Sequence, residues 1–285
     1  MRISHNLTAM NTYRQYNTNT VNTNKSMEKL SSGARINRAA DDAAGLSISE
    51  KMRSQIRGLT QATRNAQDGI SFIQTAEGAL NEVSDMLVRL KELATQAPNG
   101  TYSDKDQENI GAEMKSLGNA ISDIYSKTKF NGIHVFGSAN SAGLTTSHDG
   151  AGVAATIKYG EDGAQEVEIK SAKTTDLSAL FALTSAAGAT AASVTGVTDD
   201  AVEDAITEVN KTRADYGAQQ NQLEHASNNM AATKENLQAA ESRVRDVDMA
   251  DEMMTYTKNN ILLQAAQAML AQANSQPQGI LQLLQ

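Results

Sequence analysis

Residues 201–247 read AVEDAITEVNKTRADYGAQQNQLEHASNNMAATKENLQAAESRVRDV, with an apolar residue at every seventh position. The members of this repeat are Val202, Val209, Tyr216, Leu223, Met230, Leu237 and Val244. No proline interrupts it. A seven-residue apolar repeat sustained over this length is typical of a helix that packs along partner helices as a coiled coil. We therefore expect one long helix here, with the residues of the repeat in its core.

A similar repeat lies in the N-terminal half of the chain. Its larger apolar members, which we take as core positions, are Met52, Leu59, Ile73, Leu80 and Leu87. This pattern predicts a second long helix, and Pro98 ends it. A third apolar pattern runs from Ile110 to Ile124, after a candidate N-cap at Ser103 or Asp104. The turn between the helix that ends at Pro98 and the helix of residues 110–124 is short, so the two should pack antiparallel. The predicted fold class is mainly α, with long antiparallel helices in a coiled-coil rod.

The middle of the chain has the patterns of short strands. Asn131-Gly132 lies between apolar residues within 129–136, and this dipeptide is the strongest short signal for a β-hairpin. Residues 153–171 read as two strands around a Gly-Glu-Asp-Gly turn, and 184–196 read as a loop. We expect a small β-containing insert that is too short for a large core of its own.

Both ends of the chain are almost free of charge. Arg14 is the one charged residue between positions 3 and 24, and residues 259–285 have none. An uncharged, helix-capable end is suited to burial among copies of the same chain, because an unpaired charge would be costly there. The apolar positions expected to form an assembly face are Leu7, Met10, Leu262, Ala266, Met269, Ala273, Leu281 and Leu284. The alternative is that both ends are frayed, as chain termini often are.

Composition and motifs argue against an enzyme. The chain has 285 residues and a net charge of −8, no cysteine and four scattered histidines, so we expect no metal site, no cofactor and no nucleic-acid partner. No phosphate-binding loop or nucleophile elbow is present. Asp41-Asp42 is better interpreted as a turn or helix N-terminus than as a catalytic pair. No segment is apolar enough to span a membrane, and no Sec-type signal opens the chain.

Several longer motifs together resemble those of bacterial flagellin, the subunit of the flagellar filament. They are MRISHNLTAMNT at 1–12, KLSSGARINRAADDAAGLSIS at 29–49, QDGIS at 67–71, QTAEGAL at 74–80, FNG at 130–132, SRVRDVDMADEMM at 242–254 and QAAQAMLAQAN at 264–274. Gln285 departs from the arginine that ends many relatives. The resemblance covers residues 1–136 and 200–285.

The resemblance implies a division of the chain into filament layers. Residues 1–45 and 251–285 would form an inner-tube coiled coil (D0), and 46–136 with 197–250 would form a helical rod domain (D1) that includes a β-hairpin. Residues 137–196 would be a variable outer insert. The implied function is structural: a helical homopolymer used for swimming motility.

The resemblance also implies partners and a location. Flagellins contact flagellar cap and hook-junction proteins, are held by a secretion chaperone, and leave the cell through the flagellar type III export apparatus without a cleaved signal peptide. The protein would therefore be extracellular, in the flagellum, with no membrane insertion. A host Toll-like receptor is a further possible partner. The family motif for that receptor corresponds here to Arg89, Leu93 and Gln96, with Glu113 on the neighbouring helix.

Two other interpretations stay open at this point. A minor protein of the hook–filament junction would share the same helices, although the complete opening and closing motifs favour the filament subunit. A chemoreceptor-like signalling coiled coil would need transmembrane segments and charged helix faces up to its end, and the sequence has neither.

Overall fold

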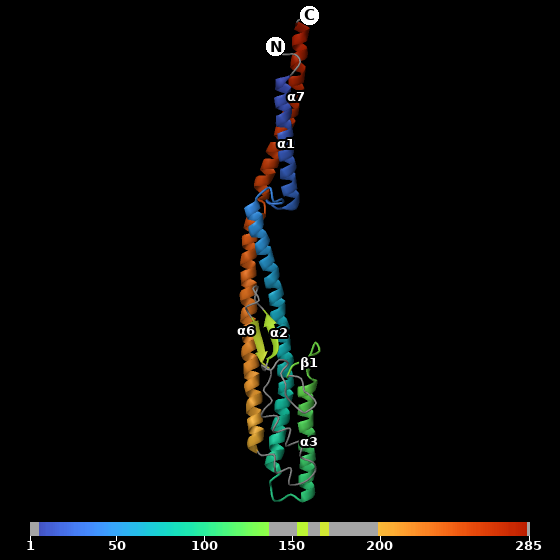
Figure 1. Ribbon diagram of the computed structural model, residues 1–285, viewed down its shortest axis with the longest axis vertical. Helices are drawn as coiled ribbons and strands as arrows, with labels where there is room; N and C mark the ends of the chain where they lie inside the picture. The colour runs from blue at the N-terminus through green and yellow to red at the C-terminus, as the bar shows by residue number, and fades with distance from the viewer. Residues whose placement is uncertain (1–5, 137–152, 159–165, 171–198, 284–285) are drawn as a thin grey trace. The chain divides into compact units, whose positions relative to one another are not determined.

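The computed structural model describes residues 6–136, 153–158, 166–170 and 199–283 (Figure 1). Its helices are α1 (Leu7–Ser32), α2 (Ala43–Gln96), α3 (Asp104–Lys127), α6 (Asp199–Arg245) and α7 (Met249–Leu283). Two antiparallel strand pairs accompany them: β1 (Lys129–Phe130) with β2 (Ile133–His134), and β3 (Val153–Lys158) with β4 (Glu166–Lys170). The expected mainly α class with a small β-containing part is confirmed.

The chain divides into two compact units, which are described separately. The first unit consists of residues 1–56 and 235–285, and the second consists of residues 57–234. The long helices α2 and α6 contribute to both units, and α1 and α7 belong to the first.

In the first unit, α1 and α7 lie side by side and run antiparallel (Figure 1). The Asn6 side chain at the start of α1 donates to the Ala273 carbonyl near the end of α7, at 2.8 Å. At the other end of the pair, Lys29 Nζ lies 3.9 Å from Glu252 Oε2. Helix α1 begins at an Asn6 cap and ends at Gly33, whose φ of 70° is the left-handed conformation that favours glycine.

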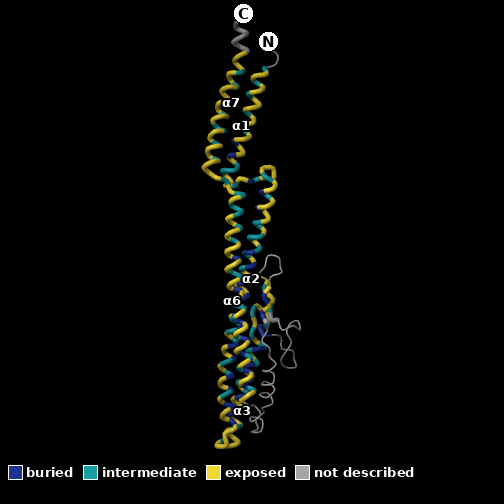
Figure 2. The backbone as a smooth tube through the Cα atoms, turned by 90° about the vertical axis from the view of Figure 1, so that its left-hand side faces the viewer, coloured by how far each residue is buried: buried dark blue, intermediate teal, exposed yellow. Residues whose placement is uncertain are grey.

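In the second unit, the two heptad repeats meet in a core built from α2, α3 and α6. Figure 2 shows buried residues gathered along these helices. The repeat positions that are buried there are Leu59, Ile73, Leu80, Leu87, Val202, Val209, Tyr216, Leu223 and Met230. Helix α3 adds Met114 and Ile121, which are also buried. Side chains at a and d positions thus fill a three-helix seam, as coiled-coil packing requires.

Three repeat positions lie in the first unit, and they are less buried than those of the second unit. Met52, Leu237 and Val244 are only half buried. Here the start of α2 faces the end of α6, with ion pairs from Glu50 to Arg245 at 2.9 Å and from Arg53 to Glu241 at 3.9 Å. Each repeat position gains cover from one partner helix rather than two, which leaves part of its surface in solvent.

The two predicted hairpins are confirmed. Asn131 and Gly132 both have positive φ, 51° and 81°, as a two-residue type I′ turn requires. The Phe130 ring lies edge-on to Phe72 of α2, with centroids 5.7 Å apart, and this contact fixes the first hairpin on the helix. The predicted loop at 184–196 lies outside the described residues.

The second hairpin rests on α2 at a glycine. A Cβ at Gly69 would lie 3.0 Å from Ile157 Cγ1 and 3.2 Å from Leu223 Cδ1, so glycine permits a closer approach of β3 than a larger residue would. The Asn65 side chain donates to the Lys158 carbonyl at 3.0 Å. On β4, Val167 and Ile169 are buried.

Helix α3 begins with a capping box, which gives a first testable prediction. Ser103 accepts from the Asp106 amide, and Asp106 accepts in return from the Ser103 amide at 3.1 Å. We expect Ser103→Ala to lower the free energy of unfolding by about 1 kcal/mol, because the first turn loses a backbone hydrogen-bond acceptor. Urea unfolding followed by circular dichroism measures the change. Thr101→Ala, outside the helix, is the control, and equal losses in the two variants would contradict the capping role.

Candidate assembly surface

The α1–α7 pair buries small and polar side chains. Asn19, Thr23 and Ser26 of α1 are less than a tenth exposed, and so is Ala266 of α7. The Thr23 hydroxyl donates a hydrogen bond to the Asn19 carbonyl at 2.8 Å. Such a seam allows the two helices to approach closely but removes little apolar surface from water, so it contributes little hydrophobic stabilisation.

Many of the large apolar side chains of α1 and α7 are exposed instead, whereas Ile36, between α1 and α2, is buried. Among the described residues, exposed large apolar side chains number twelve in the first unit and two in the second, Val88 and Ile133. Those of α1 and α7 are Leu7, Met10, Tyr13, Val21, Met27, Met249, Met253, Met254, Ile261, Leu262 and Met269. We call these eleven residues the apolar outer face. An exposed apolar surface of this extent marks an interaction site in a soluble protein.

The expected assembly face falls only partly on this surface. Leu7, Met10, Leu262 and Met269 belong to the apolar outer face. Ala266 is buried, and Ala273 is half buried with its carbonyl bound by Asn6. The side chains of Leu281 and Leu284 lie outside the described residues.

Sequence reasoning missed most of α7's first half and the middle of α1, including Val21, Met254 and Ile261. A usable signal was present: the ends contain more large apolar residues than one partner helix can cover.

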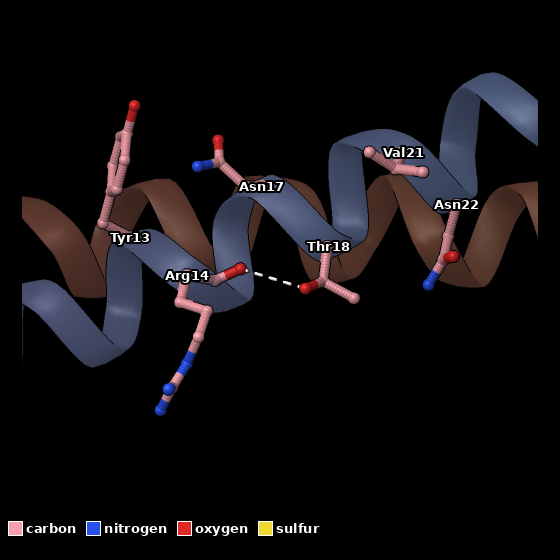
Figure 3. Close-up of a pocket in the computed structure, with 6 residues that line it drawn as sticks. All are labelled: Tyr13, Arg14, Asn17, Thr18, Val21 and Asn22. Carbon is pink, nitrogen blue, oxygen red and sulfur yellow. Dashed lines mark hydrogen bonds between the residues drawn. The ribbon is translucent and has the colours of Figure 1, made fainter.

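A shallow groove of about 410 Å³ runs along α1 (Figure 3). Tyr13, Arg14, Asn17, Thr18, Val21 and Asn22 line it. Arg14, the isolated charge of this end, donates to the Asn11 side chain at 2.9 Å. Two members of the apolar outer face thus flank amides and a single cation, a mixed surface that suits a helix of another chain better than a small polar ligand.

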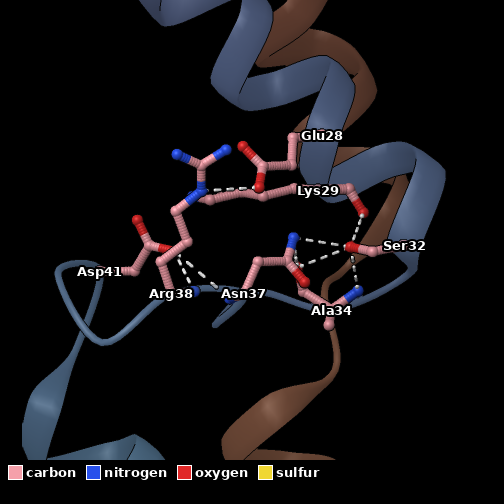
Figure 4. Close-up of polar contacts among 7 residues, drawn as sticks. All are labelled: Glu28, Lys29, Ser32, Ala34, Asn37, Arg38 and Asp41. Carbon is pink, nitrogen blue, oxygen red and sulfur yellow. Dashed lines mark hydrogen bonds and ion pairs between the residues drawn. The ribbon is translucent and has the colours of Figure 1, made fainter.

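Residues 33–42, between α1 and α2, are held by short polar contacts (Figure 4). Arg38 Nε donates to Glu28 Oε1 at 3.0 Å, and the Asn37 side chain donates to Ser32 Oγ at 2.7 Å. Asp41 Oδ2 accepts from the Arg38 and Asn37 amides at 3.0 and 3.3 Å. These contacts hold the connection against the end of α1. Asp41 thus has the turn role expected for the Asp41-Asp42 pair.

A second set of contacts ties this connection to the α6–α7 junction. The Arg35 amide donates to the Arg245 carbonyl at 2.6 Å, and the Val247 amide donates to the Gly33 carbonyl at 3.0 Å. The Arg35 guanidinium donates to the Val244 carbonyl at 2.7 Å. Two chain segments far apart in sequence therefore form a backbone-paired joint within the first unit.

The connection between α1 and α2 should respond to acid through Asp41. Hydrogen bonds from the Arg38 amide, and more weakly from Asn37, hold the pKa of Asp41 below its ordinary value of 3.8. A carboxyl whose pKa falls on folding stabilises the fold above its ordinary pKa, and this contribution disappears as the pH drops through the lowered value. We expect the Asn37 and Arg38 amide resonances to follow that titration by NMR. In Asp41→Asn the titration should vanish; its persistence would contradict the assignment.

The residues of the receptor motif lie on the second unit. Arg89 pairs with Glu92 at 2.8 Å and with Glu113 of α3 at 3.0 Å, and these two carboxylates raise its pKa. Gln96 is exposed and donates to the Tyr102 hydroxyl at 2.8 Å. Leu93 is only 2% exposed, beneath this polar surface.

Within the described ranges, no group of three or more His, Asp or Glu side chains could hold a metal ion. None of the helices, over the residues that the structure describes, is long and apolar enough to cross a membrane.

The protein-family model for the bacterial flagellin N-terminal helical region matches residues 3–141, and the family model for the C-terminal helical region matches residues 200–284. Over the full length of both chains, the sequence is 48% identical to a flagellin of Halalkalibacterium halodurans and 47% identical to a flagellin of Bacillus subtilis. It is 44% identical to the flagellar filament 30.7 kDa core protein of Treponema maltophilum, again over both full chains.

Among solved structures, a proposed flagellar hook-associated protein from Vibrio parahaemolyticus is similar in fold. The TM-score is 0.58 at 15% identity, and the match covers 72% of this chain and all of that one.

Proposed function

Because the chain belongs to the bacterial flagellin family and is thus a structural subunit of the extracellular flagellar filament, we propose that its apolar outer face is the surface along which copies assemble. The observation that carries the proposal is the inverted polarity of the α1–α7 pair, which buries Asn19, Thr23 and Ser26 and exposes large apolar residues. Residues 3–24 have only Arg14 as a charge and residues 259–285 have none, so copies of the same chain can cover these parts of the face with almost no charge to bury.

The same proposal assigns the chain to filament layers. Residues 1–45 and 251–285 form the inner tube, 46–136 and 197–250 form the rod, and 137–196 face outward. The difference between the units supports this assignment, since the second unit has a buried core of its own while α1 and α7 share a thin polar seam.

Cysteine labelling tests the assembly surface directly, because the chain has no cysteine of its own. Ile261→Cys introduces a thiol on the exposed side of α7, and we expect a maleimide to label it in the free subunit but not in sedimented polymer. Ala76→Cys, at a position that is fully buried in the second unit, is the control and should stay unlabelled in both forms. Equal labelling of Ile261→Cys in subunit and polymer would overturn the proposal.

Further partners follow from the family. We infer that the subunit travels through the flagellar type III export apparatus without a cleaved signal peptide, and that a secretion chaperone covers residues 262–284 on the way. Cap and hook-junction proteins then contact the two ends of the polymer, which serves swimming motility. The exposed Leu262 and Met269 give a chaperone an apolar helix face to hold.

We also propose that the Arg89 surface binds a Toll-like receptor of the host. Arg89, Gln96 and Glu113 offer an exposed, hydrogen-bonding surface across α2 and α3, and the buried Leu93 supports it from below. Arg89→Ala should weaken binding of the receptor ectodomain to the free subunit about tenfold or more, as loss of an interface arginine does. Lys91→Ala, which removes the pair with Glu203, is the control. Unchanged affinity in Arg89→Ala would overturn this part.

A further inference from the structure

Methionine is distributed unevenly over the chain. There are 11 methionines, and the chain has no cysteine and no tryptophan. Six methionines lie on the apolar outer face and are between 50% and 64% exposed: Met10, Met27, Met249, Met253, Met254 and Met269. Thioether sulfur is therefore the most readily oxidised group that the chain offers to solvent.

Two methionines of the second unit are buried instead. Met114 of α3 is 1% exposed and Met230 of α6 is 7% exposed, so both sulfurs are packed in the core. One chain thus carries an exposed set and a buried set of the same side chain, and reactivity toward a small oxidant follows exposure.

We propose that these six methionines form an oxidation site for peroxides, and that their sulfoxide form cannot assemble. This inference rests on the proposed function, because it requires the apolar outer face to be the surface that copies cover. In the reaction with hydrogen peroxide, a sulfur lone pair attacks one peroxide oxygen, the O–O bond breaks and an S–O bond forms. Sulfur loses two electrons, and the other oxygen takes up the proton of the transferred oxygen and leaves as water.

The sulfoxide interferes because it changes the polarity of the surface. Methionine is a flexible apolar side chain that adapts to irregular partners, and oxidation makes it polar. A sulfoxide oxygen that is buried without a donor keeps the full cost of its lost hydration. The carboxyl-terminal part of the surface has no charged donor to offer, since residues 259–285 have no lysine or arginine.

Peptide mass spectrometry tests the reactivity. The free, full-length subunit is treated with dilute hydrogen peroxide, and sulfoxide is quantified at each methionine over time. We expect Met10, Met254 and Met269 to react at least about tenfold faster than Met114. In polymer treated in the same way, the exposed set should fall to the rate of Met114. Equal rates across both sets in the free subunit would overturn the inference.

Seeded elongation tests the consequence. Subunit oxidised at the exposed set should extend filament seeds at less than about a tenth of the untreated rate, and the two methionine sulfoxide reductases with a thiol reductant should restore it. A variant with all six residues changed to leucine should extend seeds after peroxide at its own untreated rate. Two double variants serve if the sixfold variant does not fold: Met10→Leu with Met269→Leu, and Met253→Leu with Met254→Leu. Each should retain a larger part of its own untreated rate after peroxide than the native chain does.

The outcomes separate the two proposals. Untreated subunit that does not extend seeds contradicts the proposed function. Untreated subunit that extends them, with oxidised subunit extending them equally well, overturns the oxidation site alone. Loss of elongation after peroxide in the sixfold leucine variant would also overturn it, because the damage would then lie elsewhere.

Discussion

Replacing Leu262 and Met269 by aspartate should stop growth of the polymer while leaving the free subunit folded. Both side chains are exposed in α7, so the change costs little in the subunit itself. Burying two unpaired carboxylates between copies costs several kcal/mol, because residues 259–285 contain no cation and residues 3–24 contain only Arg14. We expect elongation on seeds, measured by light scattering, to fall by about a hundredfold or more, which corresponds to roughly 3 kcal/mol.

A matched control separates charge from shape. Leu262→Met with Met269→Leu exchanges the two side chains and keeps the surface apolar, so elongation should stay near the native rate. Circular dichroism of both double variants checks that the helices persist. Native growth of the aspartate variant would show that α7 does not lie between copies.

Leu80→Ala should cause the largest loss of stability in the second unit. Leu80 is fully buried in the core of the second unit, and removing its side chain leaves a cavity there. Such truncations cost roughly 2–5 kcal/mol. Urea unfolding followed by circular dichroism measures the difference in free energy.

Val88→Ala is the control for this prediction, because it truncates a half-exposed side chain of the same helix. Its cost should stay within about 0.5 kcal/mol. Similar losses in the two variants would contradict the assignment of the heptad positions to the core.

The heptad pattern predicted the second unit well because helix geometry is local. Residues seven apart lie on one face of a helix, so Ile73, Leu80 and Leu87 had to share a side of α2, and the structure buries all three. The pattern says nothing of how many helices cover that side. For this reason it could not predict that Leu237 and Val244, in the repeat of α6, are only half buried.

The hairpins illustrate the same limit. Asn131-Gly132 specifies its own turn, because both residues tolerate positive φ. The contact of Gly69 with Ile157 joins positions far apart in sequence, and no local pattern indicates it. The resemblance to flagellins likewise pointed to Leu93 without indicating that its side chain is buried.

The ends of the chain show what sequence reveals about a surface. The absence of charge from residues 259–285 predicted burial, and the structure of a single chain leaves Ile261, Leu262 and Met269 exposed. Charge patterning reports the environment in which a segment functions, whereas the orientation of each residue depends on its partner helix. Ala266 and Met269, both expected on one face of α7, therefore differ in exposure, the first buried and the second exposed.

Seeded polymerisation tests the central claim most directly. The full-length chain and a chain of residues 46–249 are mixed separately with fragments of flagella sheared from the bacterium that makes the protein, then sedimented and viewed by negative-stain microscopy. The account predicts that the full-length chain extends the fragments into long filaments and that the shortened chain stays in the supernatant. Equal extension by the shortened chain, or a full-length chain that stays soluble beside the seeds, would contradict it.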